Sequence, residues 1–255
     1  MTTGWSELEI MGKKELIFVY SPGRCGTAYL AQVFGHEAWS KNMIAMPQPD
    51  TLVMHEAATI SYRSLSVMRE TNPKGNTSLT IQGIYVRNLL KTKYKDVKKV
   101  MITSNLIGRF CSPFIINVHQ NYKCIYIERN INFLISSWVR RLRNREQVYG
   151  KKNVEDHLKK VWSYTKYTPL DKYTIIKMDK KEWFNLHINH KLRWYCSEVK
   201  ARWNQLKQEM EPNKYIETSY EKIITEDGLD EISNFINLPY SKELMKVRVN
   251  QSEKY

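Results

Sequence analysis

Cysteine is scarce in this sequence, and the few cysteines present are widely spaced. The 255 residues include four cysteines and no C-x-x-C pair. They are Cys25, Cys111, Cys124 and Cys196. This spacing is typical neither of a disulfide framework nor of a structural zinc site, so we expect no metal and a reducing cytoplasm as the location.

Long apolar runs are also missing. No run approaches the ~20 apolar residues that a membrane helix needs. The first ten residues carry Glu7 and Glu9 and lack the basic-then-apolar pattern of a signal peptide. The sequence therefore predicts a protein that is neither inserted into a membrane nor exported.

Acidic residues are outnumbered, 26 against 40 lysines and arginines, which gives a formal net charge of +14. Such a chain can bind nucleic acid, an anionic membrane or a polyanionic small ligand. No zinc-finger, homeodomain or RNA-recognition signature is present, so we expect no nucleic-acid partner. Much of the excess is lysine spread along the chain, which predicts solvated surface with a contribution to attracting an anionic cofactor. The basic run at residues 139–145 fits either a solvated helix face or a pocket for an acidic acceptor.

Aromatic residues are plentiful, with 7 Trp, 16 Tyr and 7 Phe, and they predict a globular chain. Short apolar runs alternate with longer helical patterns, which is typical of an α/β protein with a largely parallel sheet. Strands are expected at residues 16–20, 97–103, 123–128 and 173–178, and at the shorter runs 51–54 and 215–218. Helices are expected at residues 26–34, 57–69, 131–145, 154–164 and 182–210. We expect one three-layer domain over residues 1–255, with helices flanking a central, mostly parallel sheet.

The stretch Ser-Pro-Gly-Arg-Cys-Gly-Thr at residues 21–27 joins the first predicted strand to the first predicted helix. The first amides of a helix are unpaired and its dipole attracts negative charge. Gly23 and Gly26 allow the chain to curl closely around an anion. Arg24 adds a fork of donors and Thr27 adds a hydroxyl. The stretch therefore predicts a phosphate-binding loop.

Two known phosphate loops do not fit this stretch. The nucleotide-triphosphatase loop G-x-x-x-x-G-K-[ST] needs wider glycine spacing and a Lys-Ser/Thr pair, and neither is present. Without that hydroxyl there is no obvious Mg²⁺ ligand, which disfavours ATP chemistry. A cysteine-phosphatase loop would need an arginine six residues after Cys25, where the chain has Ala31.

The stretch instead resembles the 5'-phosphosulfate loop of sulfotransferases that use 3'-phosphoadenosine-5'-phosphosulfate (PAPS). The core of that loop reads (Lys/Arg)-Ser-Gly-Thr, and the chain matches it at Arg24, Gly26 and Thr27. It departs from the family at Cys25, where serine is usual, and at Ala28. The resemblance implies PAPS as co-substrate, no metal, and the P-loop nucleotide-hydrolase-like sulfotransferase fold.

A second stretch resembles the 3'-phosphate motif of the same family. That motif is a strand ending in arginine with a serine eight residues later, and Arg129 and Ser137 keep this spacing. Eight residues are just over two helical turns, so the serine can face back to the carboxyl edge of the sheet, where ligands gather in α/β folds. An arginine fork suits a phosphate at that place.

The resemblance extends to the C-terminal part of the chain. In the family, a strand is followed by the motif Tyr-Glu-Asp-Leu, a helix and the motif Phe-Leu-Gly-Leu. Residues 215–223 and 235–238 are similar to this progression. Tyr220 takes the position that lies against adenine in some members, with a core tyrosine as the alternative. The resemblance also implies that Lys246 and Arg248 reach the 3'-phosphate, unless they belong to a solvated tail.

The base that removes the acceptor proton is not at the place used by cytosolic-type members. A histidine is expected there, and the chain has Asn105, which cannot accept a proton at neutral pH. Other branches use a glutamate soon after the first βα unit, and the His55-Glu56 pair after the strand at 51–54 resembles that stretch. We expect Glu56 to be the base. Two alternatives remain open: His55 is the base, or Glu56 only provides a favourable negative charge at the start of a helix.

The predicted function is transfer of a sulfuryl group from PAPS to a hydroxyl or amine of a small molecule, such as a secondary metabolite. The Arg24 loop would stabilise the leaving phosphate. Two alternatives stay open, a P-loop nucleotide kinase or related phosphotransferase, and a non-catalytic polyanion binder.

Overall fold

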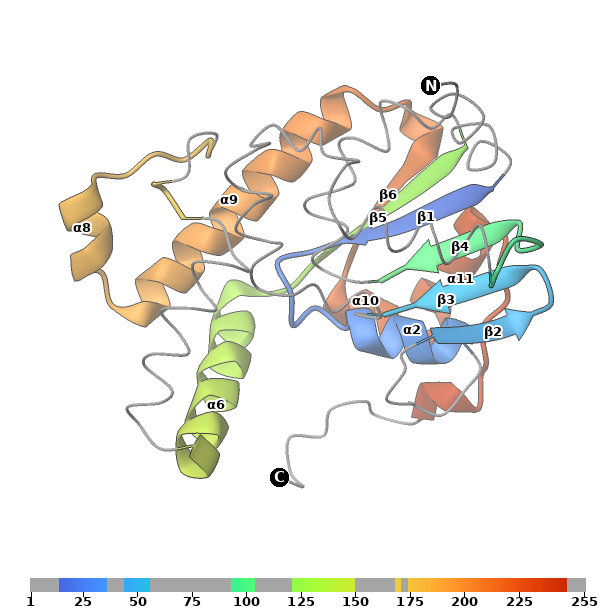
Figure 1. The fold of residues 1–255 in the computed structure, drawn as a ribbon, viewed down its shortest axis with the longest axis horizontal. Helices are drawn as coiled ribbons and strands as arrows, with labels where there is room; N and C mark the ends of the chain where they lie inside the picture. Colours follow the sequence, from blue (N-terminus) through green and yellow to red (C-terminus); the bar gives the residue numbers. More distant parts are fainter. Residues whose placement is uncertain are drawn as a thin grey trace.

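The computed structural model describes residues 14–35, 44–55, 93–103, 121–149, 168–170 and 174–246 (Figure 1). The strands are β1 (Glu15–Tyr20), β2 (Ile44–Gln48), β3 (Thr51–Met54), β4 (Lys99–Ile102), β5 (Tyr122–Glu128) and β6 (Tyr215–Ser219). The α-helices are α2 (Thr27–Gly35), α6 (Ile131–Tyr149), α8 (Lys180–Asn185), α9 (Ile188–Gln208), α10 (Tyr220–Ile223) and α11 (Glu226–Ile236). Two short 3-10 helices, η1 (Pro212–Lys214) and η2 (Leu244–Lys246), complete the described elements.

The six strands form one sheet in the order β2-β3-β4-β1-β5-β6. Strand β2 pairs antiparallel with β3, and all other neighbours pair parallel. Strand β1 is central and its residues 16–20 are all buried, as expected for a parallel strand covered on both faces. The predicted α/β class with a mostly parallel sheet is therefore confirmed.

Helices cover both faces of the sheet. On one face, Trp203 of α9 stacks on Tyr126 with ring centroids 5.0 Å apart, and it lies 5.5 Å from Tyr20. Side chains alternate across a strand, so Lys123 points to the opposite face. There its Nζ donates to the carbonyl of Phe235 in α11 at 2.6 Å.

Helix α2 lies on the same face as α11. A Cβ added at Gly35, the end of α2, would be 3.9 Å from Val53. Val53 is in register with Met101 and so with Ile17, which faces away from the α9 side. The arrangement is thus helix, sheet, helix, as predicted (Figure 1).

Two sequence predictions are wrong in the described part of the chain. Residues 174–178 form no strand, because the amides of Ile175 and Ile176 donate to the carboxylate of Glu198 on α9 at 2.9–3.1 Å. The helix expected at 182–210 is two helices, α8 and α9. His187 has an extended backbone, and its Nδ1 accepts from the amide of Asn189 as the N-cap of α9.

The other expected strands appear as β1, β3, β4, β5 and β6, and the helices expected at 26–34 and 131–145 as α2 and α6. Strand β2 was not predicted. The helices expected at 57–69 and 154–164 lie outside the described residues. None of the helices within the described ranges has the length and apolar character to cross a membrane.

Candidate functional site

The loop between β1 and α2 has an unusual backbone. Gly23, Arg24 and Gly26 have φ values of 91°, 60° and 78°, so three of four consecutive residues are in the left-handed region. Glycine adopts this conformation freely, whereas for Arg24 it is strained by roughly 1–3 kcal/mol. Successive backbone amides in turn conformations of this kind can form a concave anion-binding site. The loop therefore has the shape that a phosphate needs, directly before the free amides at the start of α2.

Side chains within the loop hold this conformation. The Oγ of Ser21 accepts from the amide of Gly23 at 3.2 Å, and the thiol of Cys25 donates to the carbonyl of Gly23 at 3.3 Å. Thr27, the first residue of α2, is buried, and Ala28 is partly exposed. Burial raises the pKa of the Cys25 thiol, so the sulfur stays protonated and is not the thiolate nucleophile of a phosphatase.

The structure brings the two predicted phosphate motifs together. The Nε of Arg24 donates to the Oγ of Ser137 on α6 at 3.1 Å. In return, the Nη1 of Arg129 at the end of β5 donates to the carbonyl oxygen of Arg24 at 2.9 Å. Each motif thus supplies one hydrogen bond to the other. Both lie at the carboxyl edge of the central strands β1 and β5, the usual ligand-binding edge of such sheets.

The Nε of Arg129 is a donor that a ligand could use. Its Nε is buried and finds no acceptor among the described residues. A buried charged donor without an acceptor is costly and marks a place where an anion is expected. This donor and the left-handed loop lie close together, because Arg129 also bonds to the carbonyl of Arg24.

Tyr220 also belongs to this cluster. Its ring centroid lies 4.0 Å from the Cζ of Arg129, a cation–π contact. The ring also covers Gly26, where an added Cβ would be 3.0 Å from Tyr220 Cδ2 and 2.8 Å from Ile223 Cδ1. Gly26 is therefore required both by its φ and by the closeness of Tyr220.

His55 lies at the same edge of the sheet, directly after β3. It is buried, and its Nδ1 is 2.7 Å from the Oγ1 of Thr103, which follows β4. The Thr103 hydroxyl donates to the carbonyl of Met54 at 3.3 Å. Since β4 separates β3 from β1, His55 lies two strand spacings, roughly 10 Å, from β1.

Three other predicted residues are exposed or lie outside the described part of the chain. Lys246 is exposed at the end of η2. Glu56 and Arg248 lie outside the described residues, as does Asn105. In the basic run of α6, Arg140 is exposed. Among the residues that the structure describes, no group of three or more His, Cys, Asp or Glu could hold a metal ion.

Sequence reasoning missed Thr103 and the contact of Tyr220 with Arg129. A signal existed for both. Thr103 ends a predicted strand and could have been placed beside the end of the strand at 51–54. Arg129 directly follows the strand predicted at 123–128, and Tyr220 comes two residues after the strand predicted at 215–218. The ends of parallel strands share one edge of the sheet.

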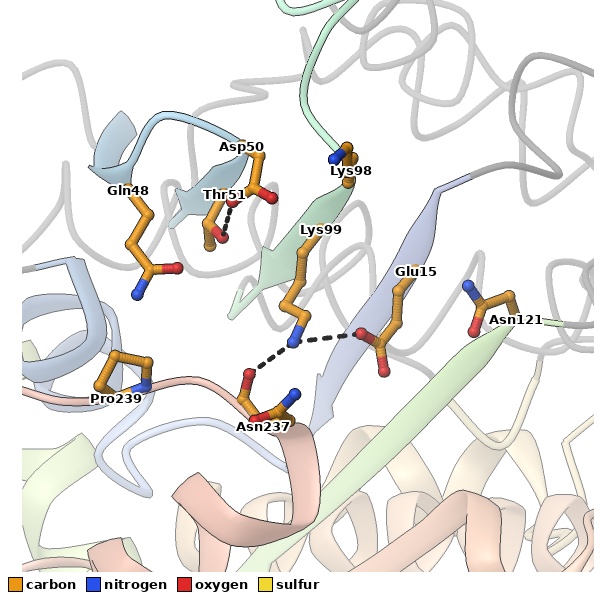
Figure 2. A pocket seen from close by; sticks show the side chains of 9 residues that line it. All are labelled: Glu15, Gln48, Asp50, Thr51, Lys98, Lys99, Asn121, Asn237 and Pro239. Carbon is orange, nitrogen blue, oxygen red and sulfur yellow. Dashed lines mark hydrogen bonds and ion pairs between the residues drawn. The ribbon is translucent and has the colours of Figure 1, made fainter.

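A separate cavity of about 460 Å³ lies at the amino ends of β1, β3 and β4, opposite the loop (Figure 2). Among its lining residues, the Nζ of Lys99 lies 3.3 Å from Glu15 and donates to the carbonyl of Asn237. Lys99 and Lys123 hold the last carbonyls of α11 in this way. These contacts join the strands to the end of α11, and none of them involves the phosphate motifs.

Comparison with known proteins supports the fold. No family model matches the chain, and no curated protein matches it. Among solved structures, the chain is similar to the sulfotransferase domain from the curacin biosynthetic pathway, with a TM-score of 0.50 and 13% identity over 93% of this chain and 79% of that one. It is equally similar to a sulfotransferase from Alicyclobacillus acidocaldarius, with a TM-score of 0.50 and 12% identity over 94% and 87% of the two chains. The expected sulfotransferase-like fold is therefore confirmed.

Proposed function

We propose that this protein is a sulfotransferase that moves a sulfuryl group from PAPS to a hydroxyl or amine of a small-molecule acceptor. The observation that carries the proposal is the pair of hydrogen bonds between Arg24, Ser137 and Arg129, at the carboxyl edge of a sulfotransferase-like sheet. A kinase would need a Lys-Ser/Thr pair after the loop, and the chain has Thr27-Ala28 there.

PAPS, when bound, supplies the sulfuryl group that is transferred. We assign its 5' end to the loop, where the amides after Gly23, the Arg24 guanidinium and the Thr27 hydroxyl would neutralise charge developing on the departing phosphate. Fixed donors of this kind do the electrostatic work without a metal ion.

The 3'-phosphate is assigned to Arg129 and Ser137. The buried Nε of Arg129 is the donor that supports this assignment. Lys246 and Arg248 are proposed to add positive charge to the same phosphate. Tyr220 is proposed to border the nucleotide, since it touches both the loop and Arg129.

The proton of the acceptor goes to a base after β3. We propose Glu56, which would take the proton as the acceptor oxygen or nitrogen bonds to sulfur. The neighbouring His55 is the second candidate, and its Nδ1 is already engaged by Thr103 inside the protein.

The proposal is tested by transfer of ³⁵S from labelled PAPS to a panel of alcohols, phenols and amines. The wild-type protein should label at least one acceptor, and Arg24→Ala should lose this activity. Lys242→Ala, at an exposed lysine paired with Glu226, is the charge-matched control and should remain active. Failure of the wild type to consume PAPS with any acceptor would contradict the proposal.

A further inference from the structure

The register of the sheet places Arg129 and Tyr220 next to each other. Strands β5 and β6 run parallel, and their last paired residues are Glu128 and Ser219. The residue after each strand, Arg129 and Tyr220, therefore leaves the sheet at the same height, about one strand spacing apart. The contact between the guanidinium and the ring follows from this register, and the Cζ lies 4.0 Å from the ring centroid.

The ring of Tyr220 is itself held in place. Tyr220 is the first residue of α10, and the Oγ of Ser219 caps that helix by accepting from the amide of Lys222 at 3.2 Å. Ile223, one turn later, is completely buried. The ring edge rests on Gly26 of the loop. Tyr220 thus contacts both the loop and Arg129.

Two contacts then hold the Arg129 guanidinium in place. Its Cζ lies over the Tyr220 ring, 4.0 Å from the ring centroid, while Nη1 donates to the carbonyl of Arg24. With the group held in this way, the buried Nε has a defined direction, although no described residue accepts from it. An arginine preorganised like this loses less freedom when it binds a phosphate.

We propose that Tyr220 is a positioning residue that acts through Arg129, and that it thereby sets the preference of the site for nucleotides with a 3'-phosphate. This inference rests on the proposed function and changes the role expected for Tyr220 from a platform for adenine to a support for the phosphate-binding arginine. The two roles make different predictions for a nucleotide that lacks the 3'-phosphate.

The test compares 3'-phosphoadenosine-5'-phosphate (PAP) with adenosine 5'-phosphate (AMP) by calorimetry. Tyr220→Leu should weaken PAP binding by roughly 3- to 30-fold, the range of a partly desolvated cation–π contact. AMP binding should change by less than about twofold. Tyr220→Met, a flexible side chain without a ring, provides a second variant if leucine is poorly tolerated beside Gly26. Tyr220→Phe retains the ring face and should restore most of the PAP affinity.

A double-mutant cycle with Arg129→Ala gives the sharper result. If Tyr220 acts through Arg129, then Tyr220→Leu should add almost nothing to the loss already caused by Arg129→Ala. Tyr215→Leu is the matched control. It removes an aromatic ring from the other end of β6, where Tyr215 packs on Trp203, and PAP binding should be unaffected.

Three results would overturn the inference. Equal losses for PAP and AMP, with additive effects in the cycle, would show that Tyr220 stacks on adenine. No loss for either nucleotide would make it a packing residue only. Wild-type protein that binds neither nucleotide would remove the proposed function as well, so the two failures are distinguishable.

Discussion

Arg129 and Arg24 lie 105 positions apart in the chain, and the Nη1 of Arg129 donates to the carbonyl oxygen of Arg24 at 2.9 Å. This single bond joins the end of β5 to the most strained residue of the loop after β1, where φ is 60°. It gives the carbonyl of Arg24 a charged donor. Arg129 therefore supports the loop in addition to any ligand that it binds.

Arg129→Ala should weaken PAP binding by about 1.5–3 kcal/mol, the scale of a hydrogen bond to a charged group. AMP should be affected much less, because it has no 3'-phosphate. Calorimetry with both ligands measures the difference. Arg193→Ala, which removes an exposed arginine bonded to Asn132, is the control and should bind both as the wild type does. Equal losses for PAP and AMP would assign Arg129 to another part of the nucleotide.

Gly26→Ala should both destabilise the protein and abolish nucleotide binding. The new methyl group would lie 2.8 Å from Ile223 Cδ1 and 3.0 Å from Tyr220 Cδ2, at a φ of 78°. Strain at a left-handed non-glycine residue costs roughly 1–3 kcal/mol before crowding is added. Adding Ile223→Val removes the nearest methyl group and should restore part of the stability. The backbone strain at residue 26 should remain. Thermal unfolding of the single and double variants separates the two effects, and wild-type stability of Gly26→Ala would contradict the geometry.

Glu198→Ala should be strongly destabilising although Glu198 has no proposed role in ligand binding or catalysis. The carboxylate is completely buried, accepts from the amides of Ile175 and Ile176, and pairs with Arg202 at 2.7 Å. Removing one member of a buried pair costs about 3–5 kcal/mol. Glu198→Gln keeps an acceptor and should cost less, about 1–3 kcal/mol.

Denaturant unfolding measures both Glu198 variants. Glu226→Ala removes an exposed carboxylate that pairs with Lys242 and should leave the midpoint nearly unchanged. A small effect of Glu198→Ala would mean that the segment at 174–178 does not need this anchor.

Stability should decrease above about pH 8.5, the usual pKa of a free thiol. Burial raises the pKa of Cys25 and of Cys124. The folded state therefore retains protons that the unfolded state loses, so the stabilisation is complete below pH 8.5 and falls as the pH rises, by up to about 1.4 kcal/mol per pH unit for each thiol. Cys25→Ser should reduce this slope. Denaturant midpoints at pH 8 and pH 10 in the presence of reductant check it, and equal midpoints in the wild type would contradict it.

Glu56→Gln should reduce turnover by roughly a hundredfold or more, the usual contribution of a general base. It keeps the shape of the side chain, so PAP affinity should hardly change. An acceptor that is already ionised, such as an acidic phenol above its pKa, should lose less activity than a neutral alcohol. Near wild-type turnover with both acceptors would remove Glu56 from the mechanism, and His55→Gln would then be the next variant.

The turn between β1 and α2 could be predicted because its determinants are local. Buried β1, the glycines at 23 and 26 and the start of α2 are consecutive in the sequence, and each indicates its own conformation. Arg129 and Ser137 could be paired because helical geometry fixes what lies eight residues apart. Parallel strands were predictable from their continuous apolar runs.

The remaining features depend on distant residues. The run at 173–178 has the apolar pattern of a strand, but its described amides at 175 and 176 bond to Glu198, about twenty residues later. Strand β2 contains Pro47 and lies at the edge of the sheet, where proline is tolerated and strand patterns are weak. The contact of Tyr220 with Arg129 depends on the pairing of β5 with β6, which no local pattern specifies.

The most direct measurement is calorimetric titration of the wild-type protein with PAP in the presence of EDTA, beside a titration with ATP and Mg²⁺. Arg24 is hydrogen-bonded to Ser137 and to Arg129, and the loop has no Lys-Ser/Thr pair. We therefore predict that PAP binds with chelator present and that ATP–Mg²⁺ binds far more weakly. Loss of PAP binding on chelation, together with tight binding of ATP–Mg²⁺, would contradict the sulfotransferase proposal and favour a phosphotransferase.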